Sequence, residues 1–272
     1  MIYLKKVIRF STYTLHSKKG FTLIELMIAL AITSVLLLGV YSAYSIQQRS
    51  YKTQRLIVSV QQNLRGALAV MEDEIRMAGY DSNTPHTGFF GITDITIDGN
   101  GNGTLEFTGD FGGAGSQNNG TLDGNETFQY TIADLPIGSP DGILDLAREA
   151  GSGRQLLAEG IEAMGFAFAF DGNDADNQLD TDAGTGAVLW GFDSDGDNVL
   201  DANVAGGGLP SSMNMDRIRA VRIWVLARTK GNVPNHTDTG SYFIGTRTVP
   251  AFNDNCRRIL LTSTINCRNM GL

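Results

Sequence analysis

The aspartates of a short duplicated phrase have the clearest potential for chemistry in this chain. The phrase Asp-x-Asp-Asn-x-Leu-Asp occurs at residues 174–180 and again at 195–201, each time after an aromatic residue and a further aspartate. Ca²⁺ takes roughly six to eight oxygen ligands in flexible geometry, and a tight loop with carboxylates at alternate positions can supply them. The acidic stretch 171–203 therefore predicts calcium binding.

The second copy supplies the fuller set of ligands. Its candidates fall at alternate positions of an EF-hand-like loop, the fourth of them through a backbone carbonyl: Asp193, Asp195, Asp197, Val199 and Asp201. Two positions depart from an EF-hand, because Asn198 replaces its glycine and Val204 its bidentate glutamate. Asparagine tolerates the positive φ of that glycine position better than most residues.

The first copy offers a similar but looser set of candidate ligands. They are Asp171, Asp174, Asp176, Asp180 and Asp182. For both copies the alternative interpretation is an acidic, solvated loop of Asx turns without metal, because Asp and Asn also favour such turns.

Two cysteines, Cys256 and Cys267, are available for a disulfide. A bond between them requires an oxidising compartment. If residues 257–265 form one extended strand, the Cα atoms lie about 36 Å apart, far beyond the ~7 Å limit for bridging. Either this segment folds back as a hairpin, or the cysteines do not pair with each other.

Catalytic chemistry has little support in the sequence. After the first 20 residues the chain has two histidines, His86 and His236, and no nucleophile stands beside a suitable activator. The Gly-rich stretches 99–103 and 112–120 lack the lysine and the following helix of a phosphate loop. We therefore expect a protein that is not an enzyme.

The N-terminal sequence places a carboxylate where hydrocarbon is expected. Residues 21–46 are an apolar run whose only charge is Glu25, and residues 1–20 carry five basic and no acidic residues. Such a run can span a membrane with the basic segment on the cytoplasmic side. An ordinary secretory signal is cleaved after its apolar region, whereas the small residue Gly20 precedes it. We predict cleavage between Gly20 and Phe21.

The sequence Lys-Lys-Gly-Phe-Thr-Leu-Ile-Glu-Leu at residues 18–26 resembles the processing site of type IV prepilins and type II secretion pseudopilins. The resemblance implies that a prepilin peptidase cuts after Gly20 and methylates the new amino terminus at Phe21. It also implies that Glu25 pairs with the amino terminus of a neighbouring subunit, which offsets the cost of burying either charge alone. A plain signal anchor with Glu25 near the membrane surface is the alternative interpretation.

The region after the apolar run predicts an amphipathic continuation of the same helix. No proline precedes Pro85, and apolar residues recur at spacings of three and four from Ile57 to Ile75. We expect residues 47–79 to seat this stripe on a globular head, with Gly79 as the terminator.

The composition after residue 80 predicts a β-rich head, because short β-branched or aromatic runs alternate with Gly, Asn and Asp. Strands are expected at residues 89–97, 104–108, 126–132, 142–148, 161–170, 187–192, 217–229, 243–249 and 257–265. Residues 221–227 alternate, with an apolar face and a second face that is partly apolar through Trp224 and Leu226, as expected for a strand covered on both sides. The head, residues 80–272, is long enough for one core, and nothing in it resembles a linker.

The charge balance argues against a nucleic-acid partner. Without residues 1–20 the chain has 16 basic and 29 acidic residues, a net charge of −13. A groove that neutralises phosphates needs clustered Lys and Arg, and the head sequence contains no such cluster.

Several later segments are similar to the minor pilins of the PilW type: residues 76–80, 159–162, 218–228 and 257–269. The J-type pseudopilins of type II secretion share this architecture. Major pilins commonly carry a proline near the twenty-second mature residue, where this chain has Ser42. The resemblance therefore favours a minor pilin over a major one.

The resemblance implies an α+β type IV pilin fold, with a long N-terminal helix packed on the β-rich head. It implies one pass through the inner membrane with the head in the periplasm, and later a place in a pilus at the cell surface. The implied partners are other major and minor pilins, the prepilin peptidase, the inner-membrane assembly platform and, before assembly, membrane lipid. The implied role is to initiate or cap pilus assembly; a minor type II secretion pseudopilin and a membrane-anchored calcium-dependent adhesin are the alternatives.

Overall fold

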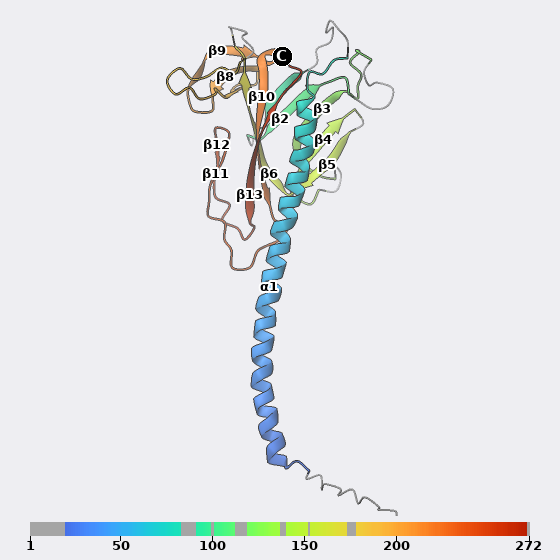
Figure 1. The fold of residues 1–272 in the computed structure, drawn as a ribbon, viewed down its shortest axis with the longest axis vertical. Helices are drawn as coiled ribbons and strands as arrows, with labels where there is room; N and C mark the ends of the chain where they lie inside the picture. The colour runs from blue at the N-terminus through green and yellow to red at the C-terminus, as the bar shows by residue number, and fades with distance from the viewer. Residues whose placement is uncertain are drawn as a thin grey trace, which may run out of the picture. The chain divides into compact units, whose positions relative to one another are not determined.

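The computed structural model describes residues 20–82, 91–98, 101–111, 119–136, 140–151, 153–172 and 178–270 of the chain. The chain divides into two compact units, with the boundary between Ser50 and Tyr51. A single α-helix, α1 (Leu23–Arg76), contains this boundary, and the strands of the described residues all belong to the second unit (Figure 1).

The first unit contains the apolar part of α1. Its most apolar 18-residue window has a mean hydropathy of 2.5, and none of that window is buried in the single chain. The helix is therefore long and apolar enough to cross a membrane.

The second part of α1 is amphipathic. Its buried side chains lie on one face at helical spacings of three and four, with Ala67 and Leu68 side by side in the middle: Val60, Leu64, Ala67, Leu68, Met71 and Ile75. This confirms the predicted stripe, although Ile57 is only half-buried. Just after the helix, Gly79 adopts a φ of +77° and donates its N–H to the Thr108 carbonyl at 3.0 Å. A Cβ at this position would meet Met270 Cγ at 2.9 Å, so glycine fits here where other residues do not.

Among the described residues, two antiparallel sheets and a hairpin build the head. The first sheet is a meander with the order β1-β2-β3-β4-β5. Its strands are β1 (Ile92–Ile97), β2 (Gly103–Thr108), β3 (Thr127–Asp134), β4 (Leu144–Ala150) and β5 (Arg154–Glu159). The second sheet has the order β13-β10-β6-β7-β8-β9. Its strands are β6 (Ile161–Phe170), β7 (Gly191–Phe192), β8 (Val199–Asn203), β9 (Gly208–Asn214), β10 (Ile218–Arg228) and β13 (Arg258–Asn266). A short 3₁₀ helix, η1 (Met215–Arg217), precedes β10, and β11 (Tyr242–Ile244) and β12 (Arg247–Val249) form the hairpin.

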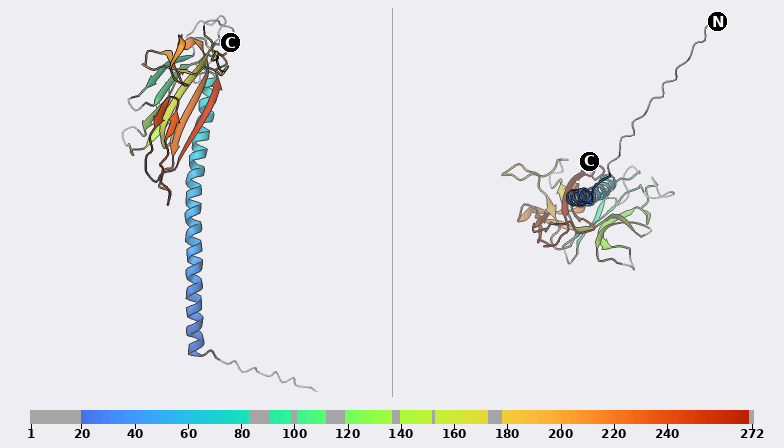
Figure 2. Two further views of the ribbon diagram at one scale, coloured as in Figure 1. Left: turned by 90° about the vertical axis from the view of Figure 1, so that its left-hand side faces the viewer. Right: turned by 90° about the horizontal axis from the view of Figure 1, so that it is seen from below.

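The stripe of α1 packs with both sheets in one core. Leu64 and Met71 are fully buried in the same cluster as Phe107 of the first sheet and Val221 of the second. Figure 2 shows this part of α1 running along the strands of the head. Each large apolar side chain buried in this way contributes roughly 1.5–3 kcal/mol relative to its exposure. The periodicity of the helix therefore determines how it seats on the sheets.

Strand β10 is covered on both faces, as its sequence predicts. Val221 and Val225 face the main core, whereas Leu226 lies on the opposite face. There it forms a second cluster with Ile244 and Val249 of the β11–β12 hairpin. The two-faced apolar pattern of this strand thus has two separate partners.

The strand predictions differ from the structure in three places. Residues 243–249, expected as one strand, form a hairpin, because the chain turns at Gly245 with a φ of +62°. Of residues 187–192, only Gly191–Phe192 is a named strand. Strands β5, β8 and β9 were not predicted. The sequence of β5, Arg-Gln-Leu-Leu-Ala-Glu, favours helix on its own, and it becomes a strand through its pairing with β4.

Glu74 ties α1 to the first sheet. Its carboxylate accepts hydrogen bonds from Arg148, at 2.9 Å from Nε and 2.7 Å from Nη2, and another from the Tyr130 hydroxyl. The Arg148 and Glu74 side chains are only 18% and 20% exposed. Burial, followed by the charge of Glu74, raises the pKa of Tyr130, so the hydroxyl keeps its proton and donates it.

Arg258 fastens the long segment between β10 and β13 to the second sheet. Its side chain is fully buried and binds three carboxylates, those of Asp238, Asp254 and Glu162. The guanidinium also lies 3.6 Å from the ring centroid of Phe252. A buried cation needs such partners, because its desolvation costs several kcal/mol.

The two cysteines do not bond to each other. Both are buried and free, and β13 is a single strand from Arg258 to Asn266 that separates Cys256 from Cys267. The hairpin that a disulfide requires is not formed, so the candidate bond is corrected to two free thiols. Burial raises the pKa of Cys267 to about 12, which keeps its thiol protonated.

Candidate functional site

The candidate processing site lies at the start of α1. Gly20 and Phe21 precede the helix, and Phe21 is 91% exposed. The bond between them is therefore open to a peptidase in the single chain. These two residues stay predicted processing residues, since their role depends on the motif.

Glu25 forms a capping box with Thr22. Its Oε2 accepts hydrogen bonds from the Thr22 backbone N–H at 2.9 Å and from the Thr22 hydroxyl at 3.0 Å. In return, the Glu25 N–H donates to the Thr22 hydroxyl at 3.3 Å. This reciprocal pattern satisfies backbone groups that the first turn of a helix leaves without partners. Sequence reasoning missed it, although Thr-x-x-Glu before an apolar run is its known signature.

The second acidic copy forms the loop between β7 and β8, and Asp193 folds it. This side chain is 1% exposed, and its carboxylate accepts the N–H groups of Asp195 (3.1 Å), Gly196 (2.7 Å) and Asn198 (2.8 Å). Asn198 adopts a φ of +63°, as its place in the EF-hand-like phrase predicts. The turn therefore forms from the hydrogen bonds of the chain itself.

Three of the five predicted ligands come together in this loop. Carboxylate oxygens of Asp193, Asp195 and Asp197 all lie within 4.8 Å of one another. The negative charge of Asp197, followed by burial and by the charges of Asp201 and Asp193, raises the pKa of Asp195. A cluster of carboxylates that repel one another and offer only oxygen atoms fits a hard divalent cation such as Ca²⁺.

The other two predicted ligands, Asp201 and Val199, contact neighbouring residues of the loop and of β9. Asp201 accepts hydrogen bonds from the Ser194 N–H at 3.0 Å and the Ser194 hydroxyl at 2.7 Å. Val199 begins β8 and pairs with Asn214 of β9. Within the described residues, the close group of carboxylates therefore contains three of the five predicted ligands.

The loop is also bonded to the edge of the first sheet, which the sequence does not reveal. Asn198 Oδ1 accepts the N–H of Ile95 at 3.0 Å, and Asn198 Nδ2 donates to Asp94 Oδ1 at 3.1 Å. Ile95 and Asp94 belong to β1, about 100 residues earlier in the sequence. A change in the loop therefore acts directly on β1.

The first acidic copy is used differently. Asp174 and Asp176 lie outside the described residues. Asp171 is buried and forms an ion pair with Arg219 at 3.7 Å, which supplies the positive charge that a cation would bring. This pairing favours the interpretation without metal for Asp171.

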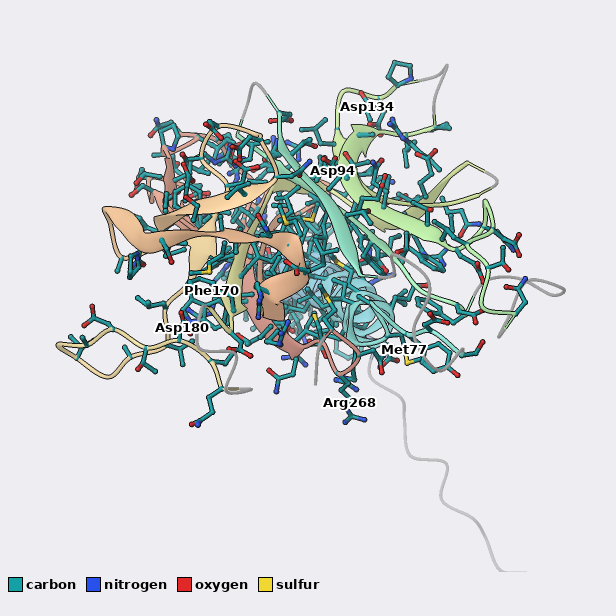
Figure 3. All side chains as sticks on the ribbon, turned by 90° about the horizontal axis from the view of Figure 1, so that it is seen from above. Met77, Asp94, Asp134, Phe170, Asp180 and Arg268 are labelled. Atoms are coloured by element: carbon teal, nitrogen blue, oxygen red, sulfur yellow. The ribbon has the colours of Figure 1, made fainter. Side chains whose placement is uncertain are left out.

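The remaining aspartates of the first copy support turns. Asp180 Oδ1 accepts the Gly172 N–H at 3.0 Å, and Asp182 Oδ1 accepts the N–H and hydroxyl of Thr185, each at 2.8 Å. The hydrogen bonds from Thr185 lower the pKa of Asp182. Figure 3 shows Asp180 beside Phe170 and away from Asp94. Within the described part of the chain, neither Asp180 nor Asp182 joins a group of three metal-binding side chains.

Two stretches of the chain match known families of proteins. Residues 15–41 match the prokaryotic N-terminal methylation motif. Residues 144–269, from the start of β4 to just beyond β13, match the family described as type IV pilus-assembly protein W. Through these two matches the chain is similar to type IV pilin-like proteins of the PilW type. Its long apolar helix and β-rich head are the α+β fold that the sequence predicts.

One similar solved structure is a type IV-like pilin from Thermus thermophilus. It shares 16% sequence identity with this chain, and the match covers 78% of this chain and 98% of that one, with a TM-score of 0.43. No curated protein matches the chain.

Proposed function

We propose that this PilW-type chain is a minor pilin that takes part in initiating or capping type IV pilus assembly. The observation that carries the proposal is the presence of both family matches on one chain, the methylation motif at 15–41 and the PilW match at 144–269. The PilW match favours a pilus over a type II secretion machine. In this role the chain is a structural subunit and does not catalyse a reaction.

Membrane insertion is the first step of the proposed function. After prepilin peptidase has removed residues 1–20, the helix of residues 21–46 spans the inner membrane and the head lies in the periplasm. It then moves laterally into the filament at the assembly platform, exchanging lipid contacts for contacts with other pilins. The exposed apolar side chains of this helix in the single chain support such an exchange.

Glu25 sets the register of the subunit in this proposal. In the single chain its carboxylate is held by Thr22, so the charge has hydrogen-bond partners before assembly. In the filament the amino group of a neighbouring subunit replaces this local partner. Two opposite charges buried together offset a desolvation cost that either would bear alone. A subunit in the wrong register leaves the amino group without its carboxylate.

The proposal includes a Ca²⁺ ion at Asp193, Asp195 and Asp197. The ion would neutralise carboxylates that repel one another and so stiffen the loop between β7 and β8. Because Asn198 joins this loop to β1, the ion would also strengthen the contact between the two sheets. The close approach of three carboxylates supports this step.

The test replaces Glu25 in the organism that makes the pilus. Mass spectrometry of the wild-type protein should show a chain that begins at a methylated Phe21. The E25A variant should be processed and inserted in the membrane but absent from sheared filaments, and filaments should be fewer. The matched control is D216N, which removes an exposed carboxylate on the head. Normal filament numbers in E25A, or an uncleaved wild-type chain, would contradict the proposal.

A further inference from the structure

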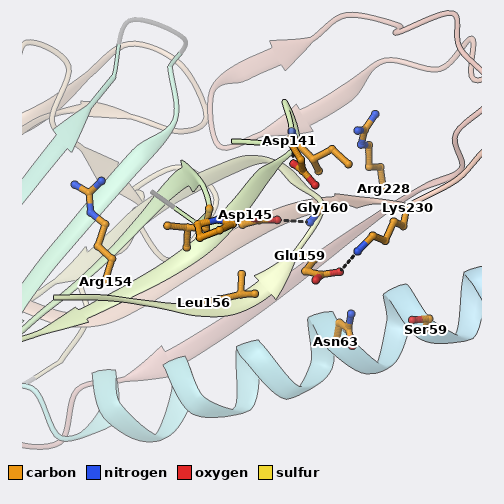
Figure 4. A pocket seen from close by; sticks show the side chains of 13 residues that line it. Ser59, Asn63, Asp141, Asp145, Arg154, Leu156, Glu159, Gly160, Arg228 and Lys230 are labelled. Atoms are coloured by element: carbon orange, nitrogen blue, oxygen red, sulfur yellow. Dashed lines mark hydrogen bonds and ion pairs between the residues drawn. The ribbon is translucent and has the colours of Figure 1, made fainter. Parts of the chain in front are cut away.

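A groove of about 400 Å³ lies between α1 and the last strand of the first sheet (Figure 4). All of its lining residues belong to the second unit of the chain. Ser59 and Asn63 of α1 form one wall, and Leu156 of β5 lies on the other. The volume falls within the range of roughly 300–1,000 Å³ that is typical of ligand sites.

One wall of the groove is the edge of a sheet. β5 is the last strand in the order of the first sheet, and β4 is its partner there. The pairing slips at Leu157, which packs against the core, so the regular part of this edge is Arg154–Leu156. All three of these side chains are exposed, and Leu156 is 51% exposed although it is apolar. The outer N–H and C=O groups of an edge strand are a template for one more strand.

The charged side chains of the groove leave an excess of carboxylate. Its three cations already pair with glutamates: Arg154 with Glu149 at 3.2 Å, Arg228 with Glu162 at 3.5 Å, and Lys230 with Glu159 at 3.0 Å. Asp141 and Asp145 also line the groove, and neither forms an ion pair among the described residues. Lys230 is near enough for both aspartates to raise its pKa, after the larger effect of Glu159. The ammonium group of Lys230 is therefore the nearby positive charge for three carboxylates, those of Glu159, Asp141 and Asp145.

Among the carboxylates of the groove, Asp145 is the one that is buried. It is 4% exposed, and its Oδ1 accepts the Gly160 N–H at 2.9 Å, as drawn in Figure 4. Burial, with a smaller contribution from the charges of Asp141 and Glu159, raises its pKa. A second cationic group in the groove would stabilise the ionised form of Asp145.

We propose that this groove docks an extended segment of a neighbouring subunit, which adds to Arg154–Leu156 as a short strand and places a lysine or arginine beside Asp141 and Asp145. The strand edge recognises a peptide backbone, Leu156 takes an apolar side chain, and the carboxylates take the cation. Because a small amine would use only the last of these features, the three together specify a polypeptide. This inference rests on the proposed function, since it describes how the subunit contacts a partner in the filament.

The test uses the full-length chain in detergent and a fluorescent pentapeptide amide, Ac-Val-Lys-Val-Thr-Val. Binding is followed by fluorescence anisotropy. A peptide with Glu in place of Lys, and one with N-methylated backbone amides, should each bind about tenfold or more weakly, equivalent to ~1.4 kcal/mol. The D141N variant should bind the lysine peptide at least about threefold more weakly, and the matched D216N variant should bind it as wild type does.

Four outcomes would overturn the inference. Equal binding of the N-methylated peptide would exclude strand addition, and equal binding of the Glu peptide would exclude the role of the carboxylates. Displacement of the peptide by an equal concentration of cadaverine would identify a site for small amines instead. Absence of saturable binding by the lysine peptide would remove the site. The E25A variant should bind the peptide normally, so failure of docking and failure of the proposed assembly step are distinguishable.

Discussion

The contact between α1 and the first sheet offers a sharp test of the energetics, through replacement of Glu74 by alanine. The variant leaves the guanidinium of Arg148 and the hydroxyl of Tyr130 without the carboxylate that both bind. Both sites are largely shielded, because the Arg148 and Glu74 side chains are 18% and 20% exposed. We expect the helix to lose an anchor near its end while its apolar stripe stays in place.

The magnitude follows from the groups left behind. Removing one partner of a buried ion pair costs roughly 3–5 kcal/mol, and a lost hydrogen bond to a buried hydroxyl adds about 1 kcal/mol. The Arg148 and Glu74 side chains keep some exposure to solvent, which reduces the cost of breaking the ion pair. We therefore expect a loss of about 3 kcal/mol in total. The E149A variant is the matched control, because Glu149 and Arg154 are 42% and 39% exposed and should lose less than about 0.5 kcal/mol.

Urea unfolding of the full-length chain in detergent, followed by near-ultraviolet circular dichroism, measures both values. A double variant, E74M together with R148M, should recover most of the loss, because no charge is then buried without a partner. A loss below about 0.5 kcal/mol in E74A, equal to that of the exposed control, would refute the reasoning, since it would show that Arg148 finds water instead.

Two other predictions concern the head. Ca²⁺ at a hundred times its dissociation constant should stabilise the chain by about 2.7 kcal/mol. In thermal melts, the D195N variant should lose this gain and the D182N variant should keep it. An unchanged melting temperature on adding Ca²⁺ or a chelator counts against the site. Hydrogen bonds from Arg258 lower the pKa of Asp254 to about 2, so its share of stability is complete above about pH 4 and is lost as the pH falls through about 2. The R258M variant should show a weaker dependence of the melting temperature on pH in this acid range. An unchanged dependence would rule out the Arg258–Asp254 ion pair as the cause of the acid destabilisation.

The sequence was most informative where the pattern is repeated. The apolar stripe of α1 and the two-faced strand β10 follow from spacing alone, because each position of a regular element has a fixed direction. Strand β5 could not be found in this way, since its composition favours helix and its pairing with β4 overrides it. The hairpin at Gly245 was missed because one positive φ in an otherwise strand-like run reverses the chain.

The acidic loop shows the corresponding limit for the site. Spacing correctly brought Asp193, Asp195 and Asp197 together, because they share one tight turn. It could not show that Ser194 occupies the carboxylate of Asp201, nor that Arg219 lies beside Asp171. The contact of Ser194 with Asp201 depends on how the loop itself folds, whereas the Asp171–Arg219 pair depends on which strands meet. Spacing alone therefore does not reveal which of the predicted ligands already accept hydrogen bonds or form ion pairs.

The capping box at the start of α1 separates two roles that Glu25 can have. Thr22 already satisfies the carboxylate locally, and loss of a side-chain cap costs about 0.5–2 kcal/mol. The T22V variant removes the hydroxyl and keeps the charge, whereas E25A removes both the cap and the partner of a neighbouring amino group. If pairing between subunits is the main role, T22V should still enter filaments and E25A should not. Equal loss of filaments in both variants would show that Glu25 acts chiefly by capping its own helix.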